Sequence, residues 1–287
     1  MFMWERVCGA RPAVMGVINV TPDSFSDGGA FVEPGAAIAH GIELAARGAD
    51  ILDVGGESTR PGAARVTAEE ETERVLPVVQ GLSAAMQVPV SIDTTKAAVA
   101  RAALDAGAVI VNDVSAGRFD PDILGVTARA GAGYVAMHML GQPRTMQLDP
   151  RYDDVVAEVG DFLVERIEAA HAAGIRPDAV AADPGIGFGK TVEHNLQLLA
   201  GLPMLANRVR APLLIGTSRK TFIGKVLARA AKAPDELAVD EREEGTLATV
   251  VWAVEHGASI VRVHDVRPAA QAIRLLDAMR AVAEGAA

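Results

Sequence analysis

The chain contains a single cysteine, Cys8, and aromatic residues make up only 4% of its 287 residues. One cysteine excludes an intramolecular disulfide and a cysteine-pair zinc site, and it is typical of a reducing compartment. Positive charge is also scarce, because 27 Lys and Arg oppose 37 Asp and Glu, which gives a net charge of −10. Binding of nucleic-acid phosphates needs an excess of Lys and Arg on one face, so this charge argues against a nucleic-acid partner.

The chain also lacks a long hydrophobic run and a recognisable targeting segment. Its start, Met-Phe-Met-Trp-Glu-Arg, has no basic region followed by an apolar stretch. The apolar run from Ala13 to Val20 contains Gly16 and Asn19 and is far too short to span a bilayer. We therefore expect a soluble, cytoplasmic protein with no membrane contact.

Short runs rich in Val, Ile, Leu and Ala alternate along the chain with longer, Ala-rich segments of helical periodicity. Glycines that follow several helical segments, such as Gly48, Gly107 and Gly174, are typical helix stops. The pattern predicts strands at Ala13–Val20, Asp50–Gly55, Val88–Asp93, Val109–Asp113, Gly133–His138, Ala179–Asp183, Ala211–Thr217 and Ser259–His264. It predicts helices that include Gly35–Ala46, Ala68–Met86, Asp153–Ala173 and Val192–Val209.

The predicted strands are apolar along their whole length, which indicates burial on both faces and hence a parallel sheet. Eight such strands alternating with helices favour a closed (β/α)8 TIM barrel, a fold of about 250 residues. An open doubly wound sheet would normally carry a glycine-rich turn after the first strand, where this chain has Asn-Val-Thr-Pro-Asp-Ser. We predict one domain over residues 1–287, with its core at about 14–280, and an exposed excursion at Lys232–Glu244.

Polar or charged residues stand at or just after the end of every predicted strand. One alone could simply cap a turn. Because the carboxyl ends of barrel strands meet at one rim, where active sites of this fold are built, all of them together predict a binding site. The residues are Asn19, Glu57–Arg60, Asp93, Asn112, Asp113, His138, Asp183, Ser218–Lys220, Arg262 and His264.

Two common catalytic motifs are excluded by their context. Gly189-Lys190-Thr191 resembles the end of a phosphate loop, but the first glycine of that motif would fall on Pro184. Proline fixes φ and supplies no N–H, so the loop cannot cradle a phosphate in the usual way. The serines of the rim lack a nucleophile-elbow sequence, which argues against covalent serine catalysis. The three glycines between Pro184 and Lys190 are interpreted as a loop whose backbone passes close to a flat ligand.

Seven segments closely resemble, in order, the signature motifs of the dihydropteroate synthases. The resemblance extends from about residue 14 to residue 280, and several matches in register are far more specific than any one. The segments are Val17–Gly29, Gly55–Gly62, Ser91–Thr94, Val111–Val114, Asp183–Lys190, Ser218–Lys220 and Arg262–Val266.

The resemblance implies a homodimeric TIM-barrel enzyme of folate biosynthesis that uses Mg²⁺. Its substrates would be 6-hydroxymethyl-7,8-dihydropterin pyrophosphate and para-aminobenzoate, and its products 7,8-dihydropteroate and pyrophosphate. The pterin ring presents a ring N–H beside an exocyclic amine, a pair of donors that one carboxylate can accept bidentately. By resemblance Asp183 accepts them, Asp93 and Asn112 contact other edge nitrogens, and Lys220 donates to the opposite edge. Phe188 and Met137 would supply apolar walls, although Met137 is almost as well explained as a core residue.

The same resemblance assigns the anion end of the site and the loops around it. Asn19, Arg262 and His264 would form the pyrophosphate site. The two bases would hold the pyrophosphate, and Asn19 would take part in holding Mg²⁺. Asp27 would stabilise a cationic intermediate, and with Lys220, Arg262 and His264 it completes the predicted catalytic set. The residues expected around para-aminobenzoate are Phe25, Thr59, Arg60, Pro61 and Thr221, of which Thr221 is equally well explained as the start of a helix. For Asp53 and His138 we favour orientation or core hydrogen bonding over catalysis.

Two alternatives differ in reaction class. A methyltetrahydrofolate-dependent methyltransferase would share the pterin end but pass a methyl group to a corrinoid protein. A non-catalytic paralogue would bind a pterin or a partner protein without turnover. The complete first and second loops and Ser218–Lys220 favour the synthase over the first. Intact Arg262 and His264 argue against the second, because a binding protein needs no leaving-group site.

Overall fold

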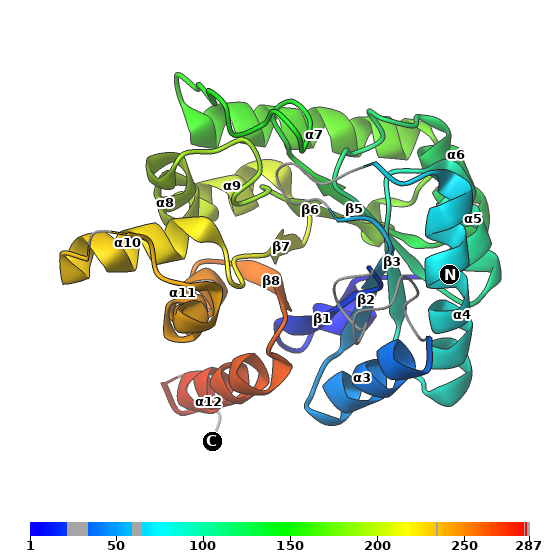
Figure 1. The fold of residues 1–287 in the computed structure, drawn as a ribbon, viewed down its shortest axis with the longest axis horizontal. Coiled ribbons are helices and arrows are strands. Elements are labelled where there is room, and N and C mark those ends of the chain that lie inside the picture. The colour runs from blue at the N-terminus through cyan, green and yellow to red at the C-terminus, as the bar shows by residue number, and fades with distance from the viewer. Residues whose placement is uncertain (22–33, 59–64, 234, 284, 286–287) are drawn as a thin grey trace.

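The computed structural model describes residues 1–21, 34–58, 65–233, 235–283 and 285. Within them, eight parallel strands form a closed barrel in the order β1 to β8. The ring closes where β1 pairs with β8, and Figure 1 shows these two strands side by side inside a ring of helices. The predicted TIM barrel is therefore confirmed. Five predicted site residues lie outside the described residues: Phe25, Asp27, Thr59, Arg60 and Pro61.

The elements follow the predicted alternation. The strands are β1 (Ala13–Asn19), β2 (Ile51–Gly55), β3 (Val90–Asp93), β4 (Ile110–Asp113), β5 (Gly133–Met137), β6 (Val180–Asp183), β7 (Leu213–Ile215) and β8 (Ala258–Val263). The α-helices are α1 (Glu5–Cys8), α3 (Pro34–Ala46), α4 (Ala68–Ala85), α5 (Ala97–Asp105), α6 (Asp122–Ala130), α7 (Val155–Ala172), α8 (Val192–Ala200), α9 (Leu202–Val209), α10 (Thr221–Ala231), α11 (Glu243–Glu255) and α12 (Val266–Ala283). None of the helices described here has the length and apolar composition needed to cross a membrane.

The strands are buried on both faces because one face lines the barrel and the other packs against helices. Small and branched side chains fill the narrow interior, as the scarcity of aromatic residues would require. Those of the interior cluster are Ala13, Met15, Ile51, Ile110, Val135, Ala181, Leu214 and Ile260. The interior is thus a packed core, and only the two ends of the barrel are left to close or to bind.

The segment before β1 closes the amino-terminal end of the barrel, a role the sequence analysis does not predict. Trp4 is buried against the interior cluster, and its indole Nε1 donates to the Ala179 carbonyl at 2.9 Å. Phe2 packs edge-on against Trp4, with ring centroids 4.9 Å apart. Because side chains fill this end of the barrel, we expect the binding site at the opposite, carboxyl end of the strands.

One predicted helix is wrong in extent. The periodic segment Val192–Val209 forms two helices, α8 and α9, that meet at Gly201. Pro203 is near the start of α9, and it has no N–H to continue the hydrogen-bond ladder from α8. Hydrophobic periodicity persists through such a break because both helices bury one face against the same barrel.

The described residues of the predicted excursion Lys232–Glu244 are largely exposed, but the prediction is wrong at Arg242. Arg242 closes the 3-10 turn η2 (Val239–Arg242) and is buried. Its guanidinium donates to the Leu237 carbonyl at 2.7 Å and to the Arg219 carbonyl at 3.1 Å. A buried guanidinium is tolerable when carbonyls accept its hydrogens, and here it fastens the excursion to the loop after β7.

Candidate active site

The polar residues predicted at the strand ends lie at the carboxyl-terminal mouth of the barrel. Asn19, Asp93 and Asp183 are the last residues of β1, β3 and β6, and Asn112 is the penultimate residue of β4. Arg262 lies in β8, one residue before its end. Parallel strands in a closed ring carry these side chains to one rim, and the contacts below join several of them directly.

A buried carboxylate, Asp53 of β2, organises the centre of the mouth. Its Oδ2 accepts from Arg262 Nε at 2.7 Å and from Asn112 Nδ2 at 3.0 Å. Arg262 also donates through Nη2 to Asp93 Oδ2 at 2.7 Å. Asp53 therefore orients two predicted ligand-binding residues, which agrees with the orienting role expected for it. Its Oδ1 has no hydrogen-bond partner among the described residues.

Asp93 shares the Arg262 guanidinium with Asp53, and the poorly hydrated position of its carboxyl group shifts its pKa. Burial raises the pKa of Asp93 from 3.8 to about 7, and the nearby Asp53 adds to the rise. Arg262 opposes this shift but does not cancel it, since its charge is divided between two carboxylates. Ionising Asp93 in the folded protein is therefore costly.

We predict that Asp93→Asn flattens the dependence of stability on pH. A folded pKa above the unfolded value means that stability is fully present below about pH 3.8 and is lost as pH rises through about 7. Each full proton contributes a slope of about 1.4 kcal/mol per pH unit. The free energy of unfolding, measured with urea from pH 4 to 8, should fall less steeply in the variant. The partly exposed Asp178→Asn should track the unmodified protein, and parallel curves for Asp93→Asn would contradict the assignment.

Asp183 and Lys220 lie near enough to the first group and to each other for their charges to interact. Asp183 is buried, and its Oδ1 accepts from the Gly185 amide at 2.7 Å. Burial raises the pKa of Asp183, while the positive charge of Lys220 opposes the rise. Burial also lowers the pKa of Lys220 to about 8, with Asp183 acting in the opposite direction. A carboxylate acceptor and an ammonium donor thus lie near each other in a poorly hydrated place.

An apolar wall adjoins this pair. Met137 and the half-buried Phe188 belong to one cluster, whose other members are Val114, Met139 and Met146. The Lys220 ammonium lies 4.7 Å from the centre of the Phe188 ring, in a cation–π contact. The structure therefore brings Met137, Phe188, Asp183 and Lys220 together, as a site for a flat, polar-edged ring requires.

The predicted anion-binding residues Arg262 and His264 lie at the end of β8 and directly after it. His264 follows β8, and its Nδ1 is 2.9 Å from the Ser218 hydroxyl, which also accepts from the His264 amide at 3.2 Å. Arg262 Nη1 makes no hydrogen bond to a described residue, so it can still donate to a ligand. Thr221 is exposed and is the first residue of α10, which fits the helix-start explanation without excluding a contact.

An ionic cluster that the sequence motifs do not predict lies at the edge of the mouth. Lys96 donates to Glu57 at 2.5 Å and also contacts Glu71, which is fully buried in α4. Glu57 in turn accepts from the Val66 amide at 3.1 Å. The position of Glu71 in the sequence indicates such a cluster, because it lies one turn before Val75 on the buried face of α4.

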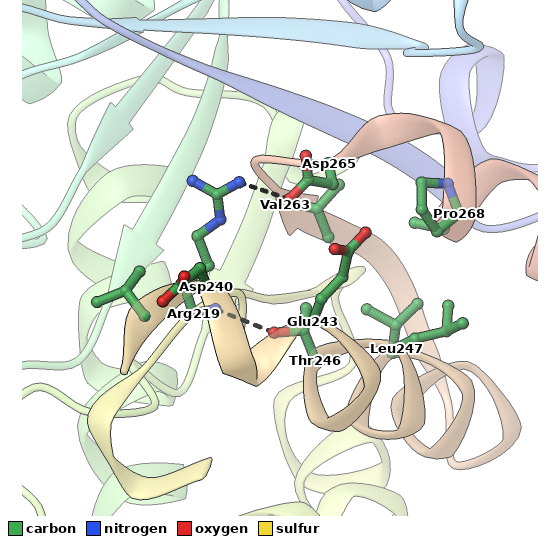
Figure 2. A pocket seen from close by; sticks show the side chains of 11 residues that line it. Arg219, Asp240, Glu243, Thr246, Leu247, Val263, Asp265 and Pro268 are labelled. Atoms are coloured by element: carbon green, nitrogen blue, oxygen red, sulfur yellow. Dashed lines mark hydrogen bonds and ion pairs between the residues drawn. The ribbon is translucent and has the colours of Figure 1, made fainter. Parts of the chain in front are cut away.

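A cavity of ≈ 120 Å³ lies beside the mouth, between the loop after β7, the start of α11 and the start of α12. Figure 2 shows Arg219 reaching Asp265 across it, an ion pair of 2.7 Å, above Leu247 of α11. Its lining includes Arg219 of the predicted rim but none of the described residues to which the family resemblance assigns a ligand, although it borders the loops that carry Lys220 and His264. The chemistry of the mouth is therefore the better guide to function than this cavity.

A closed parallel barrel with acidic and basic side chains beside an apolar wall at its mouth defines a TIM-barrel enzyme for a flat, polar ring. The chain matches the family model described as pterin binding enzyme over residues 15–264. It is 47% identical over 279 residues to the dihydropteroate synthase of Synechocystis, covering 97% of this chain and 92% of that protein. The chain belongs to the dihydropteroate synthase family of pterin-binding enzymes.

Solved structures agree with this assignment. Dihydropteroate synthase from Xanthomonas albilineans with 4-aminobenzoic acid superposes with a TM-score of 0.86 at 48% identity, covering 94% of each chain. The same enzyme in complex with 7,8-dihydropteroate gives a TM-score of 0.83 at 45% identity, again covering 94% of each chain. The family resemblance of the sequence motifs is thus confirmed over nearly the whole chain.

Proposed function

We propose that this protein joins 6-hydroxymethyl-7,8-dihydropterin pyrophosphate to para-aminobenzoate and releases 7,8-dihydropteroate and pyrophosphate. The observation that carries the proposal is the proximity of the Asp183 carboxylate and the Lys220 ammonium beside the Phe188 ring, next to the doubly anchored Arg262. One half of this arrangement suits a pterin and the other suits an anionic leaving group. The 4-aminobenzoic acid and 7,8-dihydropteroate complexes of the Xanthomonas relative support the same substrates here.

The proposed pterin contacts follow from the donor and acceptor pattern of the mouth. The Asp183 carboxylate accepts from the ring N–H and the exocyclic amine, and Lys220 donates to the opposite edge. Asp93 and Asn112, both fixed by contacts with Asp53 or Arg262, meet the remaining edge nitrogens. Met137 and Phe188 exclude water from the ring faces.

The proposed reaction needs no nucleophilic side chain. The C–O bond to pyrophosphate breaks, and the leaving group takes the electron pair while the dihydropterin ring stabilises the cationic methylene. Arg262 and His264 lower the barrier by stabilising the negative charge that develops on the leaving group. The neutral amine of para-aminobenzoate then attacks the methylene and loses a proton. By family resemblance Asp27 stabilises the cation, and Phe25, Thr59, Arg60 and Pro61 surround the second substrate.

Mg²⁺ fits this site only as an ion held mainly by the substrate. The described residues contain no group of three His, Cys, Asp or Glu that could bind a metal by themselves. Asn19 ends β1 at the mouth, and its amide oxygen is the hard ligand that Mg²⁺ prefers. Mg²⁺ commonly takes one or two protein oxygens together with phosphates and water, so Asn19 is sufficient as the proposed protein ligand. When bound, the ion would neutralise charge on the pyrophosphate.

The reaction is tested by measuring pyrophosphate release with and without para-aminobenzoate. We expect release to require both substrates and to match the dihydropteroate formed. Methyl transfer from methyltetrahydrofolate to a corrinoid protein would support the methyltransferase alternative instead. Pterin binding without release of pyrophosphate would support the non-catalytic paralogue.

We further propose that the chain acts in the cytoplasm as a homodimer of one-domain subunits. An apolar stripe on α12 supports self-association, because Leu275, Met279 and Val282 share one helix face and are each about two-thirds exposed. The single cysteine, which is half-buried, supports a reducing compartment. These proposals do not alter the chemistry of the mouth.

A further inference from the structure

The loop Gly185–Gly189 is held by side chains at every one of its carbonyl groups. Lys190 donates to the carbonyls of Gly185 and Phe188, and Lys220 donates to that of Ile186. The remaining donors are Gln147, to the Gly187 carbonyl, and Tyr152, to the Gly189 carbonyl. The loop belongs to no helix or strand, so its carbonyl groups take most of their partners from these side chains. The Gly185 carbonyl also accepts from the Phe188 amide at 3.0 Å.

Crowding by the protein itself explains Gly185 and Gly189 of this loop. Gly185 and Gly189 have φ of 65° and 63°, a region that favours glycine. A Cβ at Gly185 would lie 1.9 Å from the His138 carbonyl oxygen, and one at Gly189 would lie 2.8 Å from that of Leu140. The loop is therefore pressed against the segment after β5, and small changes there are transmitted to it.

Lys190 is the most buried of the loop's charged partners. Its side chain is almost inaccessible, and its Nζ lies 2.9 Å from the Gly185 carbonyl, 3.0 Å from the Phe188 carbonyl and 2.9 Å from His138 Nδ1. An ammonium has three hydrogens, so these three acceptors satisfy it completely. Lys190 is thus committed to protein atoms and is not placed to bind a phosphate, which agrees with exclusion of the phosphate-loop motif.

His138 is suited to accept the third hydrogen. Burial lowers the pKa of His138 to about 2, and the nearby charge of Lys190 adds to the effect, so the imidazole is neutral at ordinary pH. Burial also lowers the pKa of Lys190. The contact survives loss of a proton from Lys190, because the amine can donate to both carbonyls and accept from Nδ1–H.

The loop carries three contacts of the pterin site. Its Gly185 amide fixes the Asp183 carboxylate, its Ile186 carbonyl accepts from Lys220, and its Phe188 ring lies against the Lys220 ammonium. We propose that Lys190, held by His138, is a positioning residue that fixes this loop and through it aligns Asp183, Phe188 and Lys220 with the pterin. This inference rests on the proposed function and extends it to two residues behind the site.

Two substitutions at His138 distinguish the effect of losing the hydrogen bond with Lys190 from the effect of losing side-chain packing. His138→Asn keeps an acceptor near the position of Nδ1, whereas His138→Leu removes it, and both lose the edge contact with Phe162, whose ring centroid is 4.8 Å away. Binding of 6-hydroxymethylpterin is measured by calorimetry. His138→Leu should bind it at least tenfold more weakly than the unmodified protein, and His138→Asn should stay within about threefold. In steady-state assays, KM for the pterin substrate should rise in His138→Leu, while KM for para-aminobenzoate changes less than twofold.

Lys190→Met provides the direct test, with Lys225→Met, on the exposed face of α10, as its matched control. The first should lose at least tenfold in pterin affinity and the second none. If Lys190→Met does not fold, the two His138 variants decide the question. Equal affinities in His138→Leu and His138→Asn, or unchanged affinity in a folded Lys190→Met, would overturn the positioning role alone. Failure of the unmodified protein to bind the pterin would overturn the proposed function itself.

Discussion

Replacement of Asp183 by Asn should weaken pterin binding by about 10²- to 10⁴-fold while leaving the fold intact. The carboxylate is proposed to accept two hydrogen bonds from the pterin, and bonds to a charged partner contribute about 1.5–3 kcal/mol each. Asn retains one acceptor but turns an amide donor toward one of the pterin donors. Its Oδ1 can still accept from the Gly185 amide, which Asp183 accepts now at 2.7 Å, so the loop after β6 should keep its shape.

Calorimetry with 6-hydroxymethylpterin measures this effect, and circular dichroism checks the fold. Asp178→Asn is the matched control, because Asp178 lies before β6 at the opposite end of the same segment and pairs with Arg176 near the surface. If the Asp183→Asn variant folds and binds the pterin as tightly as the control variant, Asp183 does not bind the pterin. The proposed orientation of the ring would then also fail.

The barrel is predictable from the sequence because each strand is a short apolar run and each helix a longer amphipathic one. These periodicities depend only on local geometry, and the closed parallel ring follows from burial on both faces of all eight strands. A helix break that does not interrupt the hydrophobic periodicity cannot be predicted in this way. The break at Pro203, between α8 and α9, is such a case. Nor is the use of Trp4, whose partners are far away in the sequence.

The sequence predicts which residues form the candidate site better than it predicts the contacts among them. Strand-end positions and family motifs identify Asp93, Asn112, Asp183, Lys220 and Arg262. They do not reveal that Asp53 holds both Asn112 and Arg262, because the contact joins residues 209 positions apart. The role of Lys190 was hidden for a related reason, since its three acceptors are two carbonyls and one distant imidazole.

Arg262→Met removes the central contact of the mouth and should reduce both stability and catalysis. Two consequences follow from the loss of one guanidinium. The buried Asp53 and the partly buried Asp93 are left close together without their cation, and leaving a buried charge uncompensated typically costs about 3–5 kcal/mol of stability. The leaving group loses a donor that stabilises its developing charge, a loss that typically lowers kcat by about 10²- to 10³-fold.

These two losses are separable in a double variant, Asp53→Asn with Arg262→Met. Removing one carboxylate relieves the uncompensated charge, so the free energy of unfolding should recover in part, but no cation returns to the leaving group and kcat should stay low. The destabilisation of Arg262→Met should also grow as pH rises, because the pKa of Asp93 already lies near 7 and its remaining opposing charge has gone. Urea unfolding at pH 5 and pH 8 and the kcat of the pyrophosphate-release assay measure these effects. If kcat recovers together with stability in the double variant, Arg262 acts on structure alone. Removing the Asp53 carboxylate cannot replace a guanidinium that stabilises the leaving pyrophosphate.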